Sequence, residues 1–308
     1  MILCITPNPA IDRTLIIPSL VLGRVHRAQE MIVAAGGKGL NVARAIRTLG
    51  GEPVCMGFAG GHHGRLLADL AQHDGFHSAW TWTEAETRTC TILVAQDGDA
   101  TVINEPGMPV STADWGRLRQ DILAQLSSVG LVCISGSLPP GSSAEDFQGL
   151  LKILVGADKQ VWVDTSGAAL HTALGHPNIG VKVNGAEVGE LLGFEVRDLD
   201  SAERALTMLA NRRVAASVIT LGSAGALLAS REGRWYARGP QVDVVSTVGS
   251  GDSFLGGLAC ALDAGREWAD ALCDAVAAGT ANALLPGGAQ FRMQDFESIR
   301  KKIRVQSL

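Results

Sequence analysis

Short apolar runs alternate with segments of helical spacing along most of the chain. The runs are typical of strands buried on both faces, and they occupy residues 2–6, 54–58, 131–134, 161–163, 181–183 and 218–221. Between them, apolar residues recur at helical spacing, as in segments 42–49 and 115–122. This alternation predicts an α/β fold in which helices cover both faces of a mostly parallel sheet. Phe296, Ile299 and Ile303 share one helical face and predict a closing helix.

Two segments break this rhythm, at about residues 12–34 and 80–105. Both carry alternating, β-branched patterns with no helix between them, most clearly in residues 87–94. A turn at Asp97-Gly98-Asp99 and a further strand at 101–103 follow. We expect these strands to form a small β-sheet lid inserted in a single domain of residues 1–308, because they do not fit a parallel core.

Composition narrows the class of protein. The chain has 308 residues, 46% of them hydrophobic, which suits a large core, and its net charge of −5 gives no case for nucleic-acid binding. The six cysteines form no CxxC pair, so neither a zinc ribbon nor a thioredoxin motif is indicated. The N-terminus lacks a basic leader and no apolar run is long enough to span a bilayer, so we expect a cytoplasmic protein without membrane contact.

The strongest chemical signal is the run Gly249-Ser250-Gly251-Asp252. An expected strand at residues 242–245 leads into it, and a helix rich in small residues follows. Free amides at a glycine-rich helix start bind anions such as phosphate. A carboxylate at that place suits a general base that takes a proton from an attacking hydroxyl. Taken alone, an acidic helix cap explains Asp252 equally well.

A second glycine cluster, Gly36-Gly37-Lys38-Gly39, opens another helix and is followed by Asn41. A Walker A loop is rejected, because Ile32 and Gly39 stand where a glycine and a Ser or Thr belong. A cation and an amide beside several glycines favour a site for a polyhydroxy anion, and a flexible hinge is the alternative.

A third set, Lys182, Asn184 and Glu187, lies at the end of an expected strand. Asn184 and Glu187 could order water around Mg²⁺, although an ordinary helix start explains them as well.

Two further interpretations of the Gly-Asp-Ser-Phe run fail. An esterase triad needs a later histidine, and the last one is His176; a dinucleotide fingerprint needs glycine where Phe254 stands.

Together these signals resemble the ribokinase family of carbohydrate kinases, in its phosphofructokinase-B branch. The resemblance covers essentially the whole chain and rests on four motifs in the family's order: residues 6–12, 35–43, 134–141 and 246–253. It implies a three-layer α/β/α sandwich with a β-lid that often forms a homodimer contact, and it implies ATP and Mg²⁺ as cofactors.

The resemblance also implies roles for individual residues. Asp252 would be the catalytic base, and the amides of Gly249, Ser250 and Gly251 would hold the transferring phosphoryl group. The expected sugar-phosphate contacts are Asp12, Gly36, Gly37, Lys38, Asn41, Arg88, Ser137 and one of Arg24 or Arg27. The expected nucleotide contacts are Lys182, Asn184, Glu187, Thr220, Gly222, Val248 and Asn282, with Asn184 and Glu187 near the metal. Val183 departs from the family's usual proline but leaves its neighbours in place.

The basic side chains of the expected sugar site, from Lys38, Arg88 and Arg24 or Arg27, favour a phosphorylated ketohexose as substrate. The lid strand at residues 86–90 resembles tagatose-6-phosphate kinases, whereas residues 243–249 resemble 1-phosphofructokinases. Fructose 1-phosphate, fructose 6-phosphate and tagatose 6-phosphate therefore stay open. A kinase of an unphosphorylated sugar or nucleoside, and a non-catalytic sensor on the same fold, are the alternatives.

Overall fold

The structure is a computed structural model that describes residues 1–95, 100–212 and 214–308. The expected turn at Asp97-Gly98-Asp99 lies outside the described residues.

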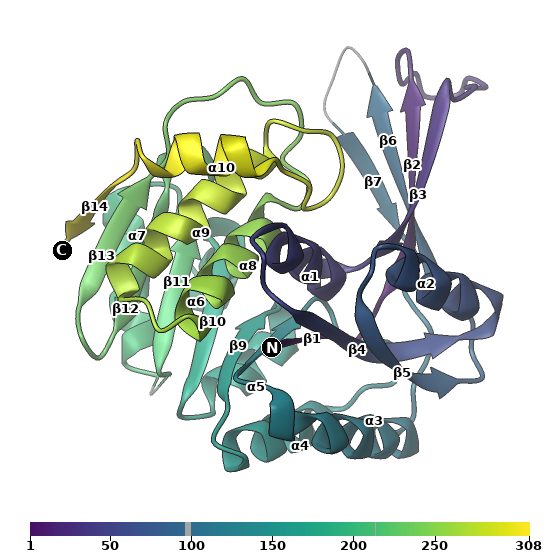
Figure 1. The fold of residues 1–308 in the computed structure, drawn as a ribbon, viewed down its shortest axis with the longest axis horizontal. Coiled ribbons are helices and arrows are strands. Elements are labelled where there is room, and N and C mark those ends of the chain that lie inside the picture. Colours follow the sequence, from purple (N-terminus) through teal and green to yellow (C-terminus); the bar gives the residue numbers. More distant parts are fainter. Residues whose placement is uncertain (96–99, 213) are drawn as a thin grey trace.

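A large, twisted sheet forms the centre of the described part of the chain (Figure 1). Its ten strands lie in the order β14-β13-β12-β11-β10-β9-β8-β1-β4-β5. Neighbouring strands from β5 to β11 are parallel, whereas β12, β13 and β14 pair antiparallel. The strands are β1 (Ile2–Thr6), β4 (Pro53–Gly60), β5 (His77–Thr83), β8 (Leu131–Ser135), β9 (Gln160–Asp164), β10 (Ile179–Asn184), β11 (Ala216–Thr220), β12 (Ala226–Ser230), β13 (Arg234–Arg238) and β14 (Arg304–Ser307). The six predicted core strands are thus confirmed.

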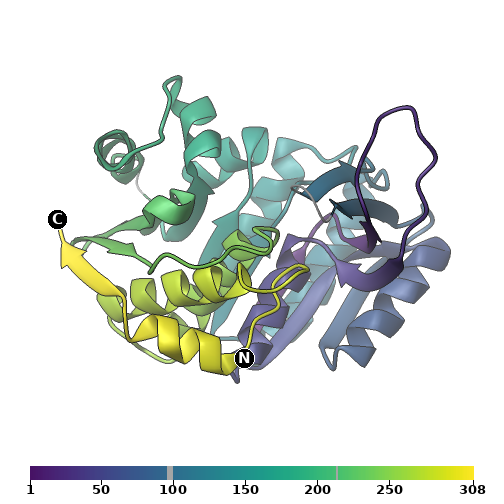
Figure 2. The ribbon, with the colours of Figure 1, turned by 90° about the horizontal axis from the view of Figure 1, so that it is seen from above.

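Helices cover both faces of this sheet, which confirms the predicted layering (Figures 1 and 2). One face packs against α1 (Lys38–Thr48), α2 (Gly61–His73), α8 (Ser250–Asp263), α9 (Trp268–Asn282) and α10 (Met293–Arg300). The other packs against α3 (Thr112–Gln125), α4 (Ala144–Gly156), α5 (Gly167–Leu174), α6 (Gly185–Leu192) and α7 (Leu199–Ala210).

Alternation along β1 shows why this sequence builds two cores. Ile2 and Cys4 enter the apolar cluster on one face, and Leu3 and Ile5 enter the cluster on the other. Successive side chains of a strand point to opposite faces, so a strand that is apolar throughout must be covered twice.

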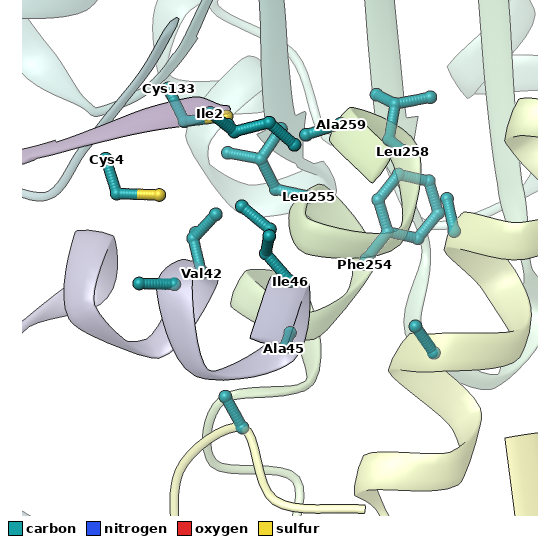
Figure 3. Packing of buried hydrophobic residues seen from close by; sticks show 14 of the residues in the cluster. Ile2, Cys4, Val42, Ala45, Ile46, Cys133, Phe254, Leu255, Leu258 and Ala259 are labelled. Carbon is teal, nitrogen blue, oxygen red and sulfur yellow. The ribbon is translucent and has the colours of Figure 1, made fainter. Parts of the chain in front are cut away.

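Helices α1 and α8 meet in the first of these cores (Figure 3). Val42 and Ile46 from α1 lie beside Leu255, and all three are fully buried. Gly256 permits the close approach, because a Cβ there would lie 2.6 Å from the Ala45 Cβ. This contact fixes the first turns of the two helices next to each other.

A separate four-stranded sheet projects from the body and forms the lid (Figure 1). Its strands lie in the order β3-β2-β6-β7, with bounds β2 (Ala10–Ile17), β3 (Glu30–Gly36), β6 (Arg88–Ala95) and β7 (Ala100–Asn104). The expected start of the second lid segment at residue 80 is too early. Strand β5 carries the same alternation but pairs in parallel with β4 at the edge of the large sheet.

Two smaller expectations are wrong. Residues 242–245 form no strand. Val244 and Val245 are each 59% exposed, and the Val245 amide donates one hydrogen bond, to the Ala283 carbonyl, in place of a strand partner. The closing helix α10 ends at Arg300, and the buried Ile303 leads into β14. Within the residues described, no helix has the length and apolar character needed to cross a membrane.

The α1–α8 contact predicts the effect of a core substitution. We expect Leu255→Ala to lower the free energy of unfolding by about 2–5 kcal/mol, because it removes apolar contact and leaves a cavity. Urea unfolding measures this loss. Leu123→Ala, at a position that is 51% exposed, is the matched control, and equal effects of the two variants would contradict the packing described.

Candidate active site

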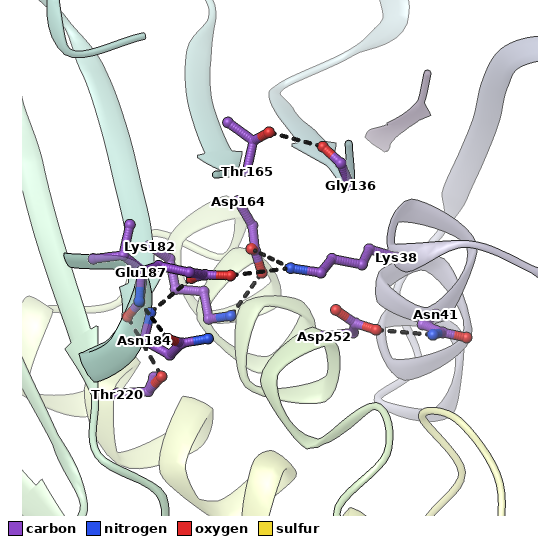
Figure 4. A network of polar contacts seen from close by, with 11 residues as sticks. Lys38, Asn41, Gly136, Asp164, Thr165, Lys182, Asn184, Glu187, Thr220 and Asp252 are labelled. Carbon is purple, nitrogen blue, oxygen red and sulfur yellow. Dashed lines mark hydrogen bonds and ion pairs between the residues drawn. The ribbon is translucent and has the colours of Figure 1, made fainter. Parts of the chain in front are cut away.

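Polar residues gather at the carboxyl edge of the parallel strands. The last residues of β8, β9, β10 and β11 are Ser135, Asp164, Asn184 and Thr220. In open α/β sheets, ligands bind at this edge. Most of the residues singled out in the sequence follow or face these strand ends, and Figure 4 shows the central group.

The start of α8 is built around Gly249. This residue has a φ of 77°, and a Cβ there would lie 2.3 Å from the Ala289 backbone nitrogen. Only glycine meets both constraints. The turn begins the helix, whose first amides have no partner within the helix and whose positive dipole end favours an anion. Of these amides, that of Ser250 donates to the Thr247 carbonyl at 3.2 Å.

A cation lies directly over this turn. A Cβ on Gly251 would lie 2.9 Å from the Lys182 Nζ, so the backbone passes close to the ammonium. Lys182 is 4% exposed and comes from β10. Helix amides and a buried ammonium together make a site suited to a phosphate oxygen.

Asp252 is buried in the first turn of α8 and faces α1. Its Oδ2 accepts a 2.8 Å hydrogen bond from the Asn41 Nδ2. Burial raises the pKa of Asp252, and the nearby Asp164 carboxylate raises it further, while Lys38, Lys182 and Asn41 act in the opposite direction. A carboxyl group with a raised pKa is suited to accept a proton near neutral pH.

Asp164, at the end of β9, is the principal residue that the sequence analysis missed. It is fully buried and binds the Lys182 Nζ at 2.6 Å and the Lys38 Nζ at 3.1 Å. Burial alone would raise the pKa of Asp164, but the two ammonium groups hold it below its ordinary value. The available signal was its place directly after a predicted core strand, where ligands collect in such sheets.

The Lys38 side chain contacts two carboxylates near the strand ends, those of Asp164 and Glu187. Its Nζ is 3.1 Å from Asp164 and 3.6 Å from the Glu187 Oε1 (Figure 4). Burial by itself would lower the pKa of Lys38, but Asp164, Asp252 and Glu187 raise it above its ordinary value. Its contact with a substrate phosphate stays a prediction.

Asn184 and Glu187 form a capping box at the start of α6. The Asn184 Oδ1 accepts from the Glu187 amide, and the Glu187 Oε2 accepts from the Asn184 amide, both at 2.9 Å. The helix-start interpretation is therefore confirmed. The oxygen donors still suit Mg²⁺ held through water, because one Glu187 oxygen stays outside the box. Among the described residues, no group of three acidic, histidine or cysteine side chains is arranged to hold a metal directly.

On the lid side, Asp12 and Gly36 lie in contact between β2 and β3. A Cβ on Gly36 would lie 2.1 Å from the Asp12 Cγ, so only glycine leaves room for the carboxyl group. Burial raises the pKa of Asp12 to about 6; Arg44 and Arg88 lower it and Asp252 raises it. Asp12 is thus electrostatically linked to Asp252 across the site.

Arg88, Asn8 and Ser137 form a neighbouring polar group. Arg88 donates to the Asn8 carbonyl at 3.0 Å and to the Glu105 carbonyl at 2.9 Å. Asn8 donates to the Ser137 Oγ at 3.2 Å, while the Asn8 Oδ1 and the Arg88 Nε are buried without a partner among the described residues. Unpaired buried groups of this kind suit a polar ligand. Asn8, in the motif at residues 6–12, was not assigned a role from sequence.

Other predicted residues lie at the edges of this arrangement. Gly37 precedes α1 with a φ of 111°, and a Cβ there would lie 2.7 Å from the Thr6 Cγ2. Arg24 and Arg27 are exposed in the loop between β2 and β3. Within the described chain neither guanidinium has a partner, and their contact with the substrate stays a prediction.

Two of the expected nucleotide contacts lie at the end of β11, and two lie at the turn before α8. Thr220 donates to the Val183 carbonyl at 3.4 Å, and Gly222 follows with a φ of 59°. Asn282 is fully buried, and its Nδ2 donates to the Val248 carbonyl at 2.9 Å and to the Ser250 Oγ at 3.0 Å. In this structure Asn282 holds the turn in place.

Comparisons with known proteins agree with this geometry. Residues 5–293 match the family described as pfkB family carbohydrate kinase. The chain is 35% identical over 254 residues to 1-phosphofructokinase of Escherichia coli strain K12, covering 82% of this chain and 81% of that protein. It is 34% identical over 273 residues to 1-phosphofructokinase of Haloferax volcanii, covering 88% and 87%.

Solved structures give the same result. The tetrameric inhibited form of phosphofructokinase-2 from Escherichia coli superposes with a TM-score of 0.91 at 30% identity, covering 98% of each chain. The complex of that enzyme with fructose-6-phosphate gives 0.89 at 29% identity, again over 98% of each chain. Since the family match spans nearly the whole sequence and both curated relatives exceed 30% identity, the chain belongs to the pfkB family of carbohydrate kinases.

Proposed function

We propose that this kinase transfers the γ-phosphoryl group of ATP to a hydroxyl of a phosphorylated ketohexose, as a 1-phosphofructokinase would, and releases a sugar bisphosphate. The observation that carries the proposal is the placement of Asp252. A buried carboxyl group with a raised pKa lies in the first turn of a helix whose backbone at Gly251 passes close to the buried Lys182 ammonium. This arrangement puts a base beside a phosphate site.

In the proposed reaction, Asp252 accepts the proton of the attacking hydroxyl. Asn41 donates to the same carboxylate and holds it in one orientation. The amides of Gly249, Ser250 and Gly251, with the Lys182 ammonium over them, receive the charge of the transferring group. Such preorganised donors supply much of the rate in phosphoryl transfer.

ATP would lie along the strand ends, with Thr220, Gly222, Val248 and Asn282 around the nucleotide. Asn184 and Glu187 would hold Mg²⁺ through water, and Mg²⁺ bound with ATP neutralises charge on its phosphates. Lys38 bridges Asp164 and Glu187 and ties this side of the site to α1.

The sugar would lie between the lid and α8. Asp12 and Asn41, with Gly36 and Gly37, would receive the hydroxyls, and Arg88 and Ser137 the phosphate. Fructose 1-phosphate is favoured because both curated relatives are 1-phosphofructokinases. Fructose 6-phosphate is the second candidate, because phosphofructokinase-2 binds it in the solved complex; tagatose 6-phosphate remains the third, and an unphosphorylated sugar or nucleoside the last.

A substrate panel tests the proposal directly. We expect ATP-dependent ADP release with fructose 1-phosphate, at a kcat/KM at least about tenfold above that with either 6-phosphate, because a misplaced charge costs about 1.4 kcal/mol or more. Free fructose and a nucleoside are the uncharged controls. Preference for an uncharged substrate, or no turnover with any sugar phosphate, would contradict the assignment.

Removal of the base tests the mechanism. We expect Asp252→Asn to reduce kcat by about 10²–10⁴ while the affinity for ATP changes little, because only proton transfer is lost. Steady-state kinetics and nucleotide titration measure the two effects. Asp243→Asn replaces an exposed carboxylate in the segment before the same turn and is the control. A kcat within tenfold of the parent enzyme would remove Asp252 from its proposed role.

We also propose that the lid joins two copies in a homodimer. The loop between β2 and β3 stands clear of the body (Figure 2), and it exposes Leu22 by 92% and Val25 by 87%. On the lid strands, Met31 is 58% and Ile103 57% exposed. Apolar side chains gathered in this way suit a protein interface. A partner's loop would also supply Arg24 and Arg27, which a single copy leaves in solvent.

Light scattering after size-exclusion chromatography tests the dimer. We expect a mass of twice the 32.2 kDa chain for the parent protein and one chain for Leu22→Glu combined with Val25→Glu, because buried charges oppose association. Leu123→Glu, on α3, places the same charge at another exposed leucine and should leave the mass unchanged. A dimer that survives the double substitution would rule out this loop as the contact.

A further inference from the structure

Arg44 lies one turn after Asn41 on α1 and contacts the Asn41 side chain. The two residues are three positions apart, so their side chains share one side of the helix. The Arg44 Nη1 donates to the Asn41 Oδ1 at 2.9 Å, and Asn41 in turn donates to Asp252 at 2.8 Å. The side chains form a chain of hydrogen bonds that ends on the proposed base.

Arg44 is itself held from several directions. Its Nη2 binds the Asp74 Oδ2 at 2.9 Å and the Ala35 carbonyl at 2.9 Å, and its guanidinium lies 5.9 Å from the centre of the Phe76 ring. Its side chain is 14% exposed. A planar guanidinium fixed at this many points has little freedom to turn away from Asn41.

The orientation of the Asn41 amide follows from chemistry. An arginine side chain has only donors, so the atom of Asn41 that faces it must be the oxygen. The NH₂ group then points at Asp252 and donates to its carboxylate. If the amide turned over, its oxygen would face the carboxylate, two acceptors would meet, and the charged form of Asp252 would lose its donor.

We propose that Arg44 is a positioning residue of the phosphoryl transfer, which locks the Asn41 amide with its donor toward the base. The inference rests on the proposed function only for the role of Asp252. The other charged groups near Asp252 are Lys38 on α1, Lys182 on β10, Asp164 on β9 and Asp12 on β2. The Arg44 guanidinium also lowers the pKa of Asp12. An effect of Arg44 on Asp252 can therefore pass through Asn41 or through Asp12, and the experiment distinguishes these two routes.

The test is a double-mutant cycle read from the pH profile of kcat. We expect Arg44→Met to move the acid limb upward by about one pH unit, since a donor to a charged group is worth roughly that much. On the acid limb this is about a tenfold loss of kcat, with little loss at pH values well above the pKa of the base. Asn41→Ala should move the limb similarly, and adding Arg44→Met to it should move the limb no further. An unmoved limb in Arg44→Met, or shifts that add in the double variant, would overturn the proposal.

Two controls make the result specific. Arg47→Met is on the same helix and removes an exposed guanidinium that donates to the Asp74 carbonyl; it should leave the profile unmoved. If Arg44→Met does not fold, Arg44→Lys replaces it. A lysine keeps the charge beside Asp74 but not the fork that reaches Asn41, so we expect a smaller shift in the same direction, and an unmoved limb would again overturn the proposal.

A readout without turnover separates this inference from the proposed function. The ¹³C shift of the Asp252 carboxyl carbon, followed against pH, should give a higher pKa in Arg44→Met than in the parent protein. If that pKa rises while Asp252→Asn retains full activity, Arg44 still positions Asp252 and the proposed base mechanism fails. If the pKa does not move, the positioning role fails whatever the kinetics show.

Discussion

The ion-paired group of Lys38, Asp164 and Lys182 is the interaction on which the site depends. A fully buried carboxylate is stable only when paired, and Asp164 has an ammonium group on each oxygen. Because its partners come from α1 and β10, the pairing holds a helix and two strand ends at one point. The first turn of α8 then lies against the second ammonium at Gly251, so the position of this helix start depends on the same charges.

The same charged residues also determine which ligands can bind beside Asp252. Around Asp252 lie two ammonium groups, from Lys38 and Lys182, and the carboxyl groups of Asp164 and Asp12. The positive charge is thus already matched before any phosphate arrives. A nucleotide would add negative charge next to a buried base whose pKa is already raised, so a cation carried with the nucleotide is needed to keep that base ionised. Under the proposed function, Asn184 and Glu187 would hold such a cation through water.

Sequence patterns predicted the local secondary structure and missed the ion pair between residues that are far apart in the sequence. The core strands and α1 were predicted from periodicity, because burial on one or two faces determines the hydrophobic pattern of neighbouring residues. Strand β5 was assigned to the lid, because the alternation of apolar and polar residues predicts a strand but not the sheet to which it belongs. The two glycine motifs each predicted a helix start, and α1 and α8 begin there. Asp164 and Lys38, however, are 126 residues apart, and no local pattern reports that they meet.

Asp12 and Asp252 show how the lid and the body could fix the direction of a substrate. One carboxyl group comes from the lid and is half-buried, the other comes from α8 and is buried, and the pKa of each is raised. Hydroxyl groups relieve two such carboxylates by donating hydrogen bonds, whereas a phosphate would add to their repulsion. Under the proposed function the polyol part therefore lies between the two carboxyl groups, and the phosphate lies toward Arg88. The same constraint explains why Gly36 must lack a side chain, since the carboxyl group of Asp12 fills that space.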